Sequence, residues 1–322
     1  MTELNALGFS LNSDKRFFDI QSKKILSFKS IQACILQQCL EEFKHLSLDQ
    51  IIDLMQPASL HPKLFSHNVE DTSIPDAIIR YDFLYSIQHP LDNHREILIH
   101  LEAQGQDTYR YALPRRCRYY MSRLISGQKN DPLGFQNSDF DEIIDIRSIW
   151  ICLHHTHQED NCFLEYRTQE HVRRGNFRFD PECYDFSQIY LLYPCIHTDA
   201  NIHLEEIMNR PKDIMEFLSL LFLSNREFDE IRLILEKKYD IVVTEELKTE
   251  VEKMCTFSEG AFLAWQERGL EQGLEKGKVE TLVDNISSLL ESGLISDVQQ
   301  AFSILHVKKD LQSKVLQHLQ LH

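Results

Sequence analysis

Acidic residues in the stretch 78–104 have a spacing that could bind a metal ion. The stretch reads IIRYDFLYSIQHPLDNHREILIHLEAQ, and its two halves have the aromatic, β-branched and alternating residues that are typical of strands. The turn between the halves would be formed by Pro90, Asp92 and Asn93. If the strands pair antiparallel around a turn centred near Asp92, we expect Asp82 to lie opposite Glu102.

Such a pairing would bring two negative charges together. Directly opposed Cβ atoms in a sheet lie about 4.5 to 5.5 Å apart, so the carboxylates of Asp82 and Glu102 would repel each other unless a cation lay between them. A hard divalent ion is the natural cation for carboxylate oxygens. The residue types and their spacing therefore indicate a site for a divalent metal ion.

Side-chain alternation would sort this hairpin into two faces. The polar face would carry Asp82, Ser86, His100, Glu102 and Gln104. The opposite, hydrophobic face would carry Tyr81, Phe83, Tyr85, Ile97, Ile99 and Leu101. The alternative is an ordinary hairpin with its polar face in solvent, where aspartate and glutamate are common.

The segment 105–126, GQDTYRYALPRRCRYYMSRLIS, is predicted to be a loop followed by a helix that carries several arginines. On this helix a basic and aromatic stripe would be formed by Arg116, Tyr119 or Tyr120, and Arg123. Such a stripe is suited to phosphate groups. The alternative places the tyrosines in the core and the arginines in solvent.

A set of ordered motifs resembles one known family. The motifs are YDFLYSI with Asp82, ILIHLEAQ with Glu102 and Gln104, RRCRYYMSRLIS, RSIWICLHH, MCTFSEG and ERGLEQGLEKGK. In this order they resemble the PD-(D/E)XK nuclease family transposases, also called recombination-promoting nucleases. The resemblance covers nearly the whole chain. The ExQ pattern is typical of this family, whereas most of the wider superfamily has ExK.

The resemblance implies a fold and an activity. The fold would be α/β, with a PD-(D/E)XK restriction-endonuclease-like core, in which helices flank a mixed sheet, and an all-helical C-terminal region. The nuclease-like domain would cover 1–200, a helical region 201–260 and a helical tail 261–322. The activity would be hydrolysis of DNA phosphodiester bonds with Mg²⁺, or another divalent cation such as Mn²⁺, and the partner would be DNA.

The resemblance also implies roles for particular residues. Asp82 and Glu102 would hold the metal ion, and Gln104 would orient the attacking water. Glu42, near the end of a helix predicted over 30–43, would be a third acidic group. The DNA-binding residues would be Arg115, Arg116, Tyr120 and Arg123. Because Gln104 has no positive charge, we expect the activity to be weak or to borrow a charge from Arg116.

Periodicity predicts further elements around this hairpin. Helices are expected over 30–43, 46–55, 208–222, 228–239 and 244–254, and strands over 146–155 and at QIYLLYPCIH. The strand over 146–155 is almost continuously apolar, which is typical of a strand covered on both faces of a sheet. The strand, strand, helix, strand order indicates an α/β core.

Composition limits the class of protein. The chain has 322 residues, 43% of them hydrophobic, so it can bury a sizeable core. Its net charge of −16 argues against broad, non-specific coating of nucleic acid but not against a local basic surface. We expect a cytoplasmic protein with reduced cysteines and no membrane association, because signal-peptide and membrane-span patterns are missing and the cysteines are scattered.

Glycines in the tail repeat at helical spacing. Gly269, Gly273 and Gly277 would line one side of a helix and let another helix approach closely, which indicates a possible homo-oligomer. A flexible linker is the alternative.

Other functions remain open at this point. A zinc site could be built from Cys152, His154, His155, His157 and Cys162, although their spacing lacks CxxC and HxxxH patterns. Because Gln104 is neutral, the chain could instead be a catalytically silent nucleic-acid-binding module. It could also be an interaction protein whose main role lies in the helical region and the tail.

Overall fold

The protein is described by a computed structural model that divides into two compact units, Met1–Glu259 and Gly260–His322. The described residues are 17–55, 69–71, 79–104, 111–131, 134–155, 158–195, 202–224, 226–295, 297–307, 311–312, 315–316 and 319. For residues 69–71, 93, 256–276, 280 and 291 the description covers the backbone alone.

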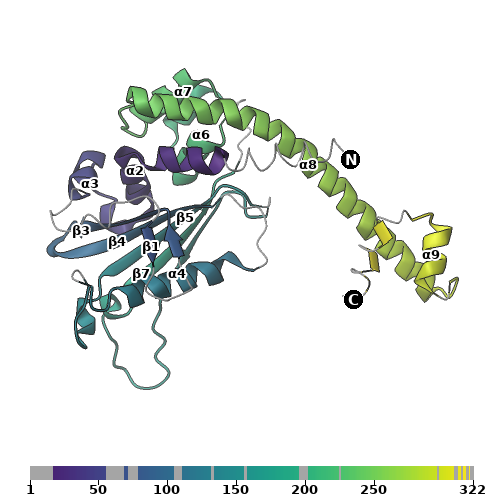
Figure 1. The fold of residues 1–322 in the computed structure, drawn as a ribbon, viewed down its shortest axis with the longest axis horizontal. Coiled ribbons are helices and arrows are strands. Elements are labelled where there is room, and N and C mark those ends of the chain that lie inside the picture. Colours follow the sequence, from purple (N-terminus) through teal and green to yellow (C-terminus); the bar gives the residue numbers. More distant parts are fainter. Residues whose placement is uncertain are drawn as a thin grey trace. The chain divides into compact units, whose positions relative to one another are not determined.

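A five-stranded mixed sheet forms the centre of the first unit (Figure 1). In spatial order its strands are β3 (Phe83–His89), β4 (Asp92–Gln104), β5 (Asp145–Cys152), β7 (Ser187–Tyr193) and β6 (Cys162–Tyr166). The three central strands are parallel, and each edge strand is antiparallel to its neighbour. β5 and β7 are buried almost throughout, as expected for parallel strands with both faces covered. The predicted α/β class, with a mixed sheet flanked by helices, is confirmed.

The hairpin of β3 and β4 has the predicted register but a different turn. Phe83 pairs with Leu101, so the register continues to Asp82 and Glu102. Pro90 and Leu91 form the turn, whereas Asp92 and Asn93, which were predicted as turn residues, begin β4. The register shifts between Gln88 and His89, and this irregularity moves the turn away from the centre that the rest of the pairing implies.

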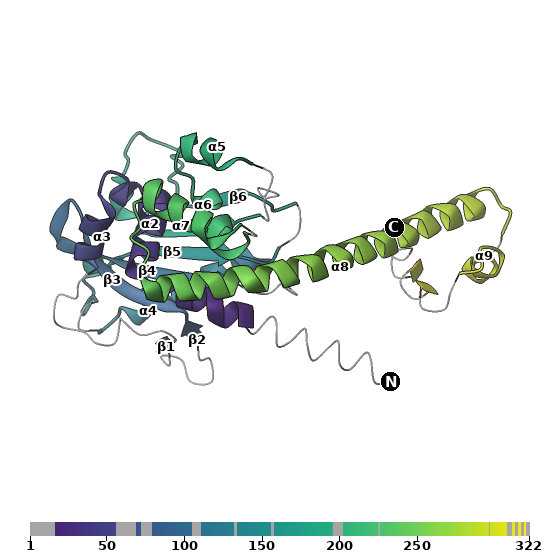
Figure 2. The same cartoon turned by 90° about the horizontal axis from the view of Figure 1, so that it is seen from above.

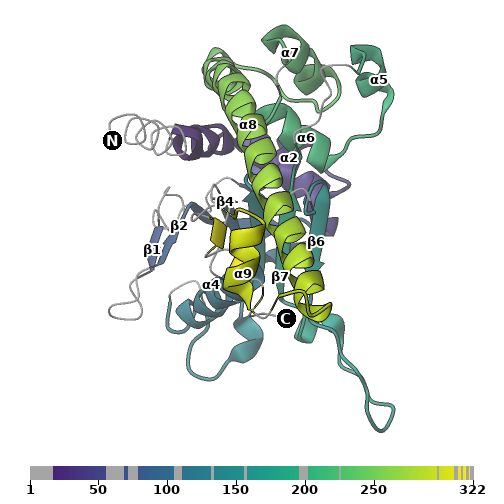
Figure 3. The same cartoon turned by 90° about the vertical axis from the view of Figure 1, so that its right-hand side faces the viewer.

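A bend at Asp82 separates β3 from β2 (Ile79–Tyr81), which pairs with β1 (Val69–Asp71) in a small second sheet (Figure 3). The bend interrupts the alternation of side chains. Tyr81 therefore lies against His100, with ring centroids 5.1 Å apart, and not on the opposite face with Phe83 as predicted. The placement of Tyr81 was wrong because a continuous strand was assumed through Asp82.

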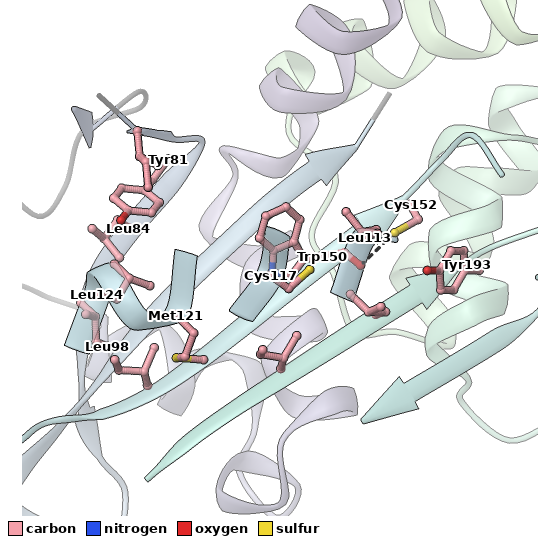
Figure 4. Packing of buried hydrophobic residues seen from close by; sticks show 14 residues of the cluster. Tyr81, Leu84, Leu98, Leu113, Cys117, Met121, Leu124, Trp150, Cys152 and Tyr193 are labelled. Atoms are coloured by element: carbon pink, nitrogen blue, oxygen red, sulfur yellow. Dashed lines mark hydrogen bonds between the residues drawn. The ribbon is translucent and has the colours of Figure 1, made fainter. Parts of the chain in front are cut away.

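Helices cover both faces of the sheet. α4 (Leu113–Gly127) lies on one face, and α2 (Lys29–Cys39), α3 (Leu48–Leu54) and α6 (Ile214–Phe222) lie on the other (Figures 1 and 2). Figure 4 shows the core under α4, where hydrophobic side chains of this helix meet those of the strands. This core includes Tyr81, Leu98, Leu113, Cys117, Met121, Leu124, Trp150 and Tyr193.

Helix ends follow local signals that periodicity alone does not give. The helix predicted over 208–222 is two helices, α5 (Leu204–Asn209) and α6, because Pro211 interrupts it and the Asp213 side chain caps α6 by accepting from Glu216 N at 2.8 Å. The helix predicted over 30–43 ends at Cys39 and is followed by a 3₁₀ turn, Glu41–Phe43.

The remaining helices of the first unit begin near their predicted positions. α7 is Phe228–Lys237. α8 (Glu245–Glu291) starts after Thr244, whose hydroxyl accepts from Leu247 N at 3.2 Å as a helix cap. Residues 202–254 belong to the same compact unit as the sheet. Two contacts connect them to the N-terminal helices: Gln21 donates to Glu250, and α2 contacts α6.

The second unit contains the end of α8 and α9 (Val298–Ile304) around a separate hydrophobic cluster. The backbone of the predicted glycine stripe is helical, which contradicts the flexible-linker alternative for these residues. At Gly277 an added Cβ would meet no described atom within 4 Å, so the described residues leave open space beside this glycine. None of the described helices combines the length and apolar character needed to cross a membrane. The eight cysteines all lie in the described part of the chain and form no disulfide bond there.

Candidate active site

The predicted acidic pair lies in a buried polar site between the sheet and α4. Asp82 occupies the bend before β3, and Glu102 and Gln104 lie near the end of β4. These three residues are 8%, 4% and 5% exposed, respectively. The alternative of a solvent-exposed polar face is therefore wrong, because α4 covers that face. We call Lys23, Asp82, Glu102, Gln104 and Arg116 the site cluster.

The two carboxylates are held together by main-chain amides. Asp82 N donates to Glu102 Oε2 at 3.2 Å, and Ala103 N donates to Asp82 Oδ2 at 3.0 Å. Each acidic side chain thus accepts an N–H group at or beside the other acidic residue. The antiparallel register fixes this exchange, so the backbone itself keeps the negative charges adjacent.

This proximity changes the acidity of Asp82. Burial, followed by repulsion from Glu102, raises the pKa of the Asp82 carboxyl to about 6, although Lys23 and the Ala103 amide oppose the rise. A cation bound between the carboxylates would relieve the repulsion. The raised pKa therefore supports the expectation that the pair can hold a divalent ion.

Lys23 is a member of the site that the sequence analysis missed. It lies on the helical segment 17–26, and its Nζ is 2.9 Å from Asp82 Oδ1 and 3.0 Å from Asp19 Oδ2. Burial lowers the pKa of Lys23, but the hydrogen bonds and charges of these two aspartates outweigh it and raise the pKa overall. The spacing of Asp19 and Lys23 by four residues could have indicated a local helical pair, but nothing in the sequence connects Lys23 with the hairpin.

Arg116 from α4 closes the other side of the site. Its Nη1 donates to Gln104 Oε1 at 3.0 Å, and its Nη2 lies 3.3 Å from Glu102 Oε1 and 3.0 Å from the Tyr120 hydroxyl. The guanidinium stacks over the rings of Tyr120 and Trp150, at 4.9 and 5.4 Å from their centroids. Gln104 Nε2 in turn donates to Glu102 Oε1 at 3.0 Å, so Gln104 and Arg116 both orient Glu102.

A buried chain of polar groups supports Glu102 from behind. Trp150 Nε1 donates to Ser148 Oγ at 2.8 Å, and Ser148 Oγ lies 2.8 Å from His100 Nδ1. His100 Nε2 lies 3.4 Å from Glu102 Oε2. Ser148 Oγ accepts from Trp150, so its own hydrogen is available to His100 Nδ1, which leaves the ring proton on Nε2. Nε2 faces Glu102 but makes no hydrogen bond of good geometry among the described residues. We therefore assign the Nε2–H tautomer to His100.

Glu42 does not join the site. Its Oε1 lies 2.6 Å from Arg147 Nη2, and Arg147 also lies 3.3 Å from Asp145. Arg147 and Ser148 are neighbours on β5 and so point to opposite faces, which places Glu42 across the sheet from His100. The prediction of Glu42 as a third acidic group of the site was wrong because Arg147 binds it elsewhere. We call Glu42, Arg95, Asp145 and Arg147 the support cluster.

The arginines predicted to bind DNA lie in different environments. Arg115 is exposed on α4, whereas Arg123 is 3% exposed and donates to the Tyr119 hydroxyl at 3.3 Å. Tyr120 packs against the core while its hydroxyl accepts from Arg116. α4 thus has one exposed arginine available for phosphate and one tyrosine packed in the core, so each of the two interpretations of its sequence is correct in part. The burial of Arg123 makes a phosphate contact by this residue unfavourable.

The histidine and cysteine stretch that suggested zinc is arranged differently. His155 Nδ1 lies 2.8 Å from the Cys152 carbonyl, and its Nε2 lies 3.0 Å from Asp160 Oδ1. His157 lies outside the described residues. Within the described part of the chain, no group of three or more histidine, cysteine, aspartate or glutamate side chains is placed to hold a metal ion.

That finding also applies to the site cluster, which offers two carboxylates. Magnesium typically keeps several waters and binds to one or two carboxylates together with substrate phosphates, so two ligands from the chain suffice. Asp82 and Glu102 fit this requirement because they are adjacent, buried and mutually repulsive. Comparisons with protein-family models, curated proteins and solved structures find no match for this chain.

Proposed function

We propose that the chain is a Mg²⁺-dependent DNA endonuclease of the PD-(D/E)XK type, similar to transposases, that hydrolyses phosphodiester bonds. The observation that carries the proposal is the pairing of Asp82 and Glu102 inside a buried polar site, where Glu102 accepts the main-chain amide of Asp82 and Asp82 accepts that of Ala103. Repulsion between their charges makes a divalent ion a suitable ligand. The motif resemblance supplies DNA as the substrate and transposase-like as the class.

The order of elements is compatible with this class of fold. Two antiparallel strands, β3 and β4, carry the acidic pair, α4 follows them, and β5 then joins β4 in parallel. The strand, strand, helix, strand order is the one that periodicity predicts, and the resemblance implies a mixed sheet flanked by helices. We therefore propose that the sheet of the first unit is a PD-(D/E)XK restriction-endonuclease-like core.

The residues of the site cluster would divide the work. Asp82 and Glu102 would hold the ion, which when bound would lower the pKa of a coordinated water and neutralise charge on the scissile phosphate. Gln104 would orient the attacking water through its amide. Arg116 keeps Gln104 and Glu102 in place through hydrogen bonds of 3.0 and 3.3 Å, and His100 supports Glu102 from the buried side.

DNA would be bound by arginines that remain at the surface. Arg115 and Arg118 are exposed on α4, close in sequence to Arg116. A second basic stretch lies in the loop between β6 and β7, which extends beyond the sheet in Figures 1 and 3. Its exposed arginines are Arg173, Arg174 and Arg178. Each exposed arginine can neutralise a phosphate although the whole chain is acidic.

The direct test is incubation of the full chain with supercoiled plasmid in Mg²⁺, in Mn²⁺ and in EDTA. We expect nicked and linear DNA with either metal and none in EDTA. A matched preparation of Asp82→Asn, which preserves side-chain volume, controls for a contaminating nuclease. Equal nicking by this variant and by the wild-type chain would reject the proposal.

A catalytically silent nucleic-acid-binding module is the second candidate. Lys23 and Arg116 already pair with Asp82 and Glu102, as a purely structural ion network would require. A divalent-ion titration separates the candidates. The nuclease requires saturable metal binding that disappears in Asp82→Asn, whereas the silent module requires DNA binding without it.

Assembly through the tail is a separate proposal. The glycine stripe lies within α8 and would allow a helix of a second copy to approach closely. Light scattering on the wild-type chain and on Gly277→Leu would test it, and we expect a homo-oligomer that the leucine weakens.

A further inference from the structure

During hydrolysis of a phosphodiester, additional negative charge develops on a phosphate that is already negatively charged. The site cluster brings two carboxylates to this group, so positive charge beyond a metal ion would stabilise the reacting phosphate. Gln104 cannot supply this charge because its amide is neutral. The identity of the cation that faces the substrate is therefore inferred on the basis of the proposed function.

Among the described residues, two cations contact the acidic pair, and they are held in different ways. Arg116 is held by Gln104, Glu102 and Tyr120 and lies over two aromatic rings, so its guanidinium is fixed on several sides. Lys23 contacts Asp82 at 2.9 Å and Asp19 at 3.0 Å, and its side chain is 30% exposed. Lys23 is thus the cation with more freedom to reach a ligand.

The donors of Lys23 also favour this residue. An ammonium has three N–H donors, and two of them are directed to Asp82 and Asp19. Within the described part of the chain, one donor remains for an incoming oxygen. When a phosphate and a metal ion engage Asp82, Asp19 would still hold the amine near the site. A flexible point charge of this kind is suited to phosphate oxygens.

We propose that Lys23 is the phosphate-binding cation of this site, supplied by the helical segment 17–26 and not by the position of Gln104. It contacts a non-bridging oxygen of the scissile phosphate and stabilises the charge that develops there. The positive charge therefore comes from a segment far from the hairpin in sequence, which explains why a neutral residue is compatible with catalysis at position 104.

The first experiment measures binding without catalysis. Fluorescence anisotropy with a short labelled DNA duplex in EDTA compares the wild-type chain, Lys23→Met and Lys24→Met over a range of salt. Lys24 is a matched control because it is the next residue and pairs with Glu250 at 3.6 Å, outside the site cluster. We expect Lys23→Met to weaken DNA binding and to lower the slope of log affinity against log salt by about one unit, with no change in Lys24→Met.

The second experiment measures plasmid nicking and its rescue. We expect Lys23→Met to reduce the nicking rate by about 100-fold, the scale of losing one preorganised charge contact in a transition state. Gln104→Lys in the same chain should restore at least a tenth of the activity, because Gln104 Nε2 lies 3.0 Å from Glu102 Oε1 and a lysine there faces the same site. A role limited to supporting Asp82 structurally would not give this rescue.

Several results would overturn the proposal and leave the nuclease intact. Wild-type binding slope and nicking in Lys23→Met, with Asp82→Asn inactive, would remove Lys23 from the reaction. Faster nicking or tighter Mg²⁺ binding in Lys23→Met would show that Lys23 blocks the site. Lost nicking without rescue by Gln104→Lys would make Lys23 a structural partner of Asp82. In contrast, nicking by Asp82→Asn would reject the proposed function itself.

A measurement on the unmodified chain covers the case in which Lys23→Met does not fold. Lysine acetylation read by mass spectrometry, with and without DNA in EDTA, reports each amine separately. We expect DNA to protect Lys23 at least tenfold and to leave Lys24 unchanged. Equal acetylation of Lys23 in both conditions would contradict the proposal.

Discussion

Two ionic clusters lie on opposite faces of the same sheet, and they arrange similar charges differently. In the support cluster Arg147 lies between the carboxylates of Glu42 and Asp145, and Arg95 approaches Asp145 from outside at 3.4 Å. In the site cluster the carboxylates are adjacent, and the cations lie on their outer sides. Each cluster contains two carboxylates and two cations, so net charge does not distinguish them.

The position of the cations gives the clusters different chemistry. Burial raises the pKa of Asp145, and Arg147 and Arg95 oppose this rise without cancelling it. Burial is the largest cause of the raised pKa of Asp82, and the like charge of Glu102 is the second largest. A carboxylate that already has an arginine between itself and its neighbour gains little from a metal ion. The site cluster can gain from one, which is why we place the reaction there.

The largest expected difference between the clusters is in activity. We expect Asp82→Asn and Glu102→Gln each to lower plasmid nicking by about 1,000-fold or more, because each removes a charged ligand of the metal ion. Alanine at either position should also abolish nicking. Glu42→Gln is the matched control from the support cluster and should nick within about threefold of the wild-type rate. Circular dichroism on the same preparations checks folding. A comparable loss of nicking in Glu42→Gln would contradict the assignment of the reaction to the site cluster alone.

The reverse difference is expected in stability. Arg147→Ala should lower the free energy of unfolding by about 3 to 5 kcal/mol, because it leaves the buried charges of Glu42 and Asp145 without their shared partner. Urea unfolding followed by circular dichroism measures this change. A loss below about 1 kcal/mol would mean that the support cluster does not stabilise the sheet.

The third prediction concerns the pH dependence of the site cluster. Asp82 has a folded pKa of about 6, above the unfolded value of 3.8, so its contribution to stability is fully present below about pH 4 and is lost as the pH rises through 6. Metal binding needs the ionised form and should therefore strengthen by about tenfold per pH unit below pH 6. Calorimetric Mg²⁺ titrations between about pH 5 and pH 8 should show this rise in affinity. A flat profile would exclude Asp82 as the titrating ligand.

Much of the sheet could be predicted because its signals are local. The apolar pattern of 146–155 and the strand patterns that begin at Phe83 and Ile97 indicate buried strands and their register without knowledge of the rest of the chain. The burial of the polar face was not predictable in the same way. It depends on α4 folding back over β4, and Arg116 then covers the carboxylates that a hairpin alone would expose.

The missed and misplaced site residues have a common cause. Glu42 lies near the end of the helix predicted over 30–43, and Lys23 lies in a segment for which no element was predicted. In neither case does the sequence say which face of the sheet the side chain reaches. Lys23 contacts Asp82, whereas Glu42 is captured by Arg147 on the other face. Charge type at a helical position is therefore weak evidence for membership of a site, and long-range pairing decides it.

A smaller effect is expected for Gln104→Lys. The new ammonium would lie near Glu102 and add a positive charge to the site, so we expect nicking to be unchanged or up to about tenfold higher. Arg116 would lose its acceptor on Gln104, which limits the gain. Nicking rates at saturating Mg²⁺ measure the result. A loss as large as that of Glu102→Gln in a folded variant would mean that the amide has a role that charge cannot replace.

The smallest effect is expected at the arginines of α4. Arg115→Ala should lower the slope of log DNA affinity against log salt by about one unit and leave Mg²⁺ affinity unchanged, because Arg115 is exposed and lies outside the site cluster. Arg173→Ala, in the exposed loop before β7, is the matched comparison. Loss of slope in Arg115→Ala alone places the duplex along α4. Loss of slope in Arg173→Ala alone places the duplex along the loop. Loss of slope in both variants requires DNA long enough to contact two separate basic surfaces of an otherwise acidic chain.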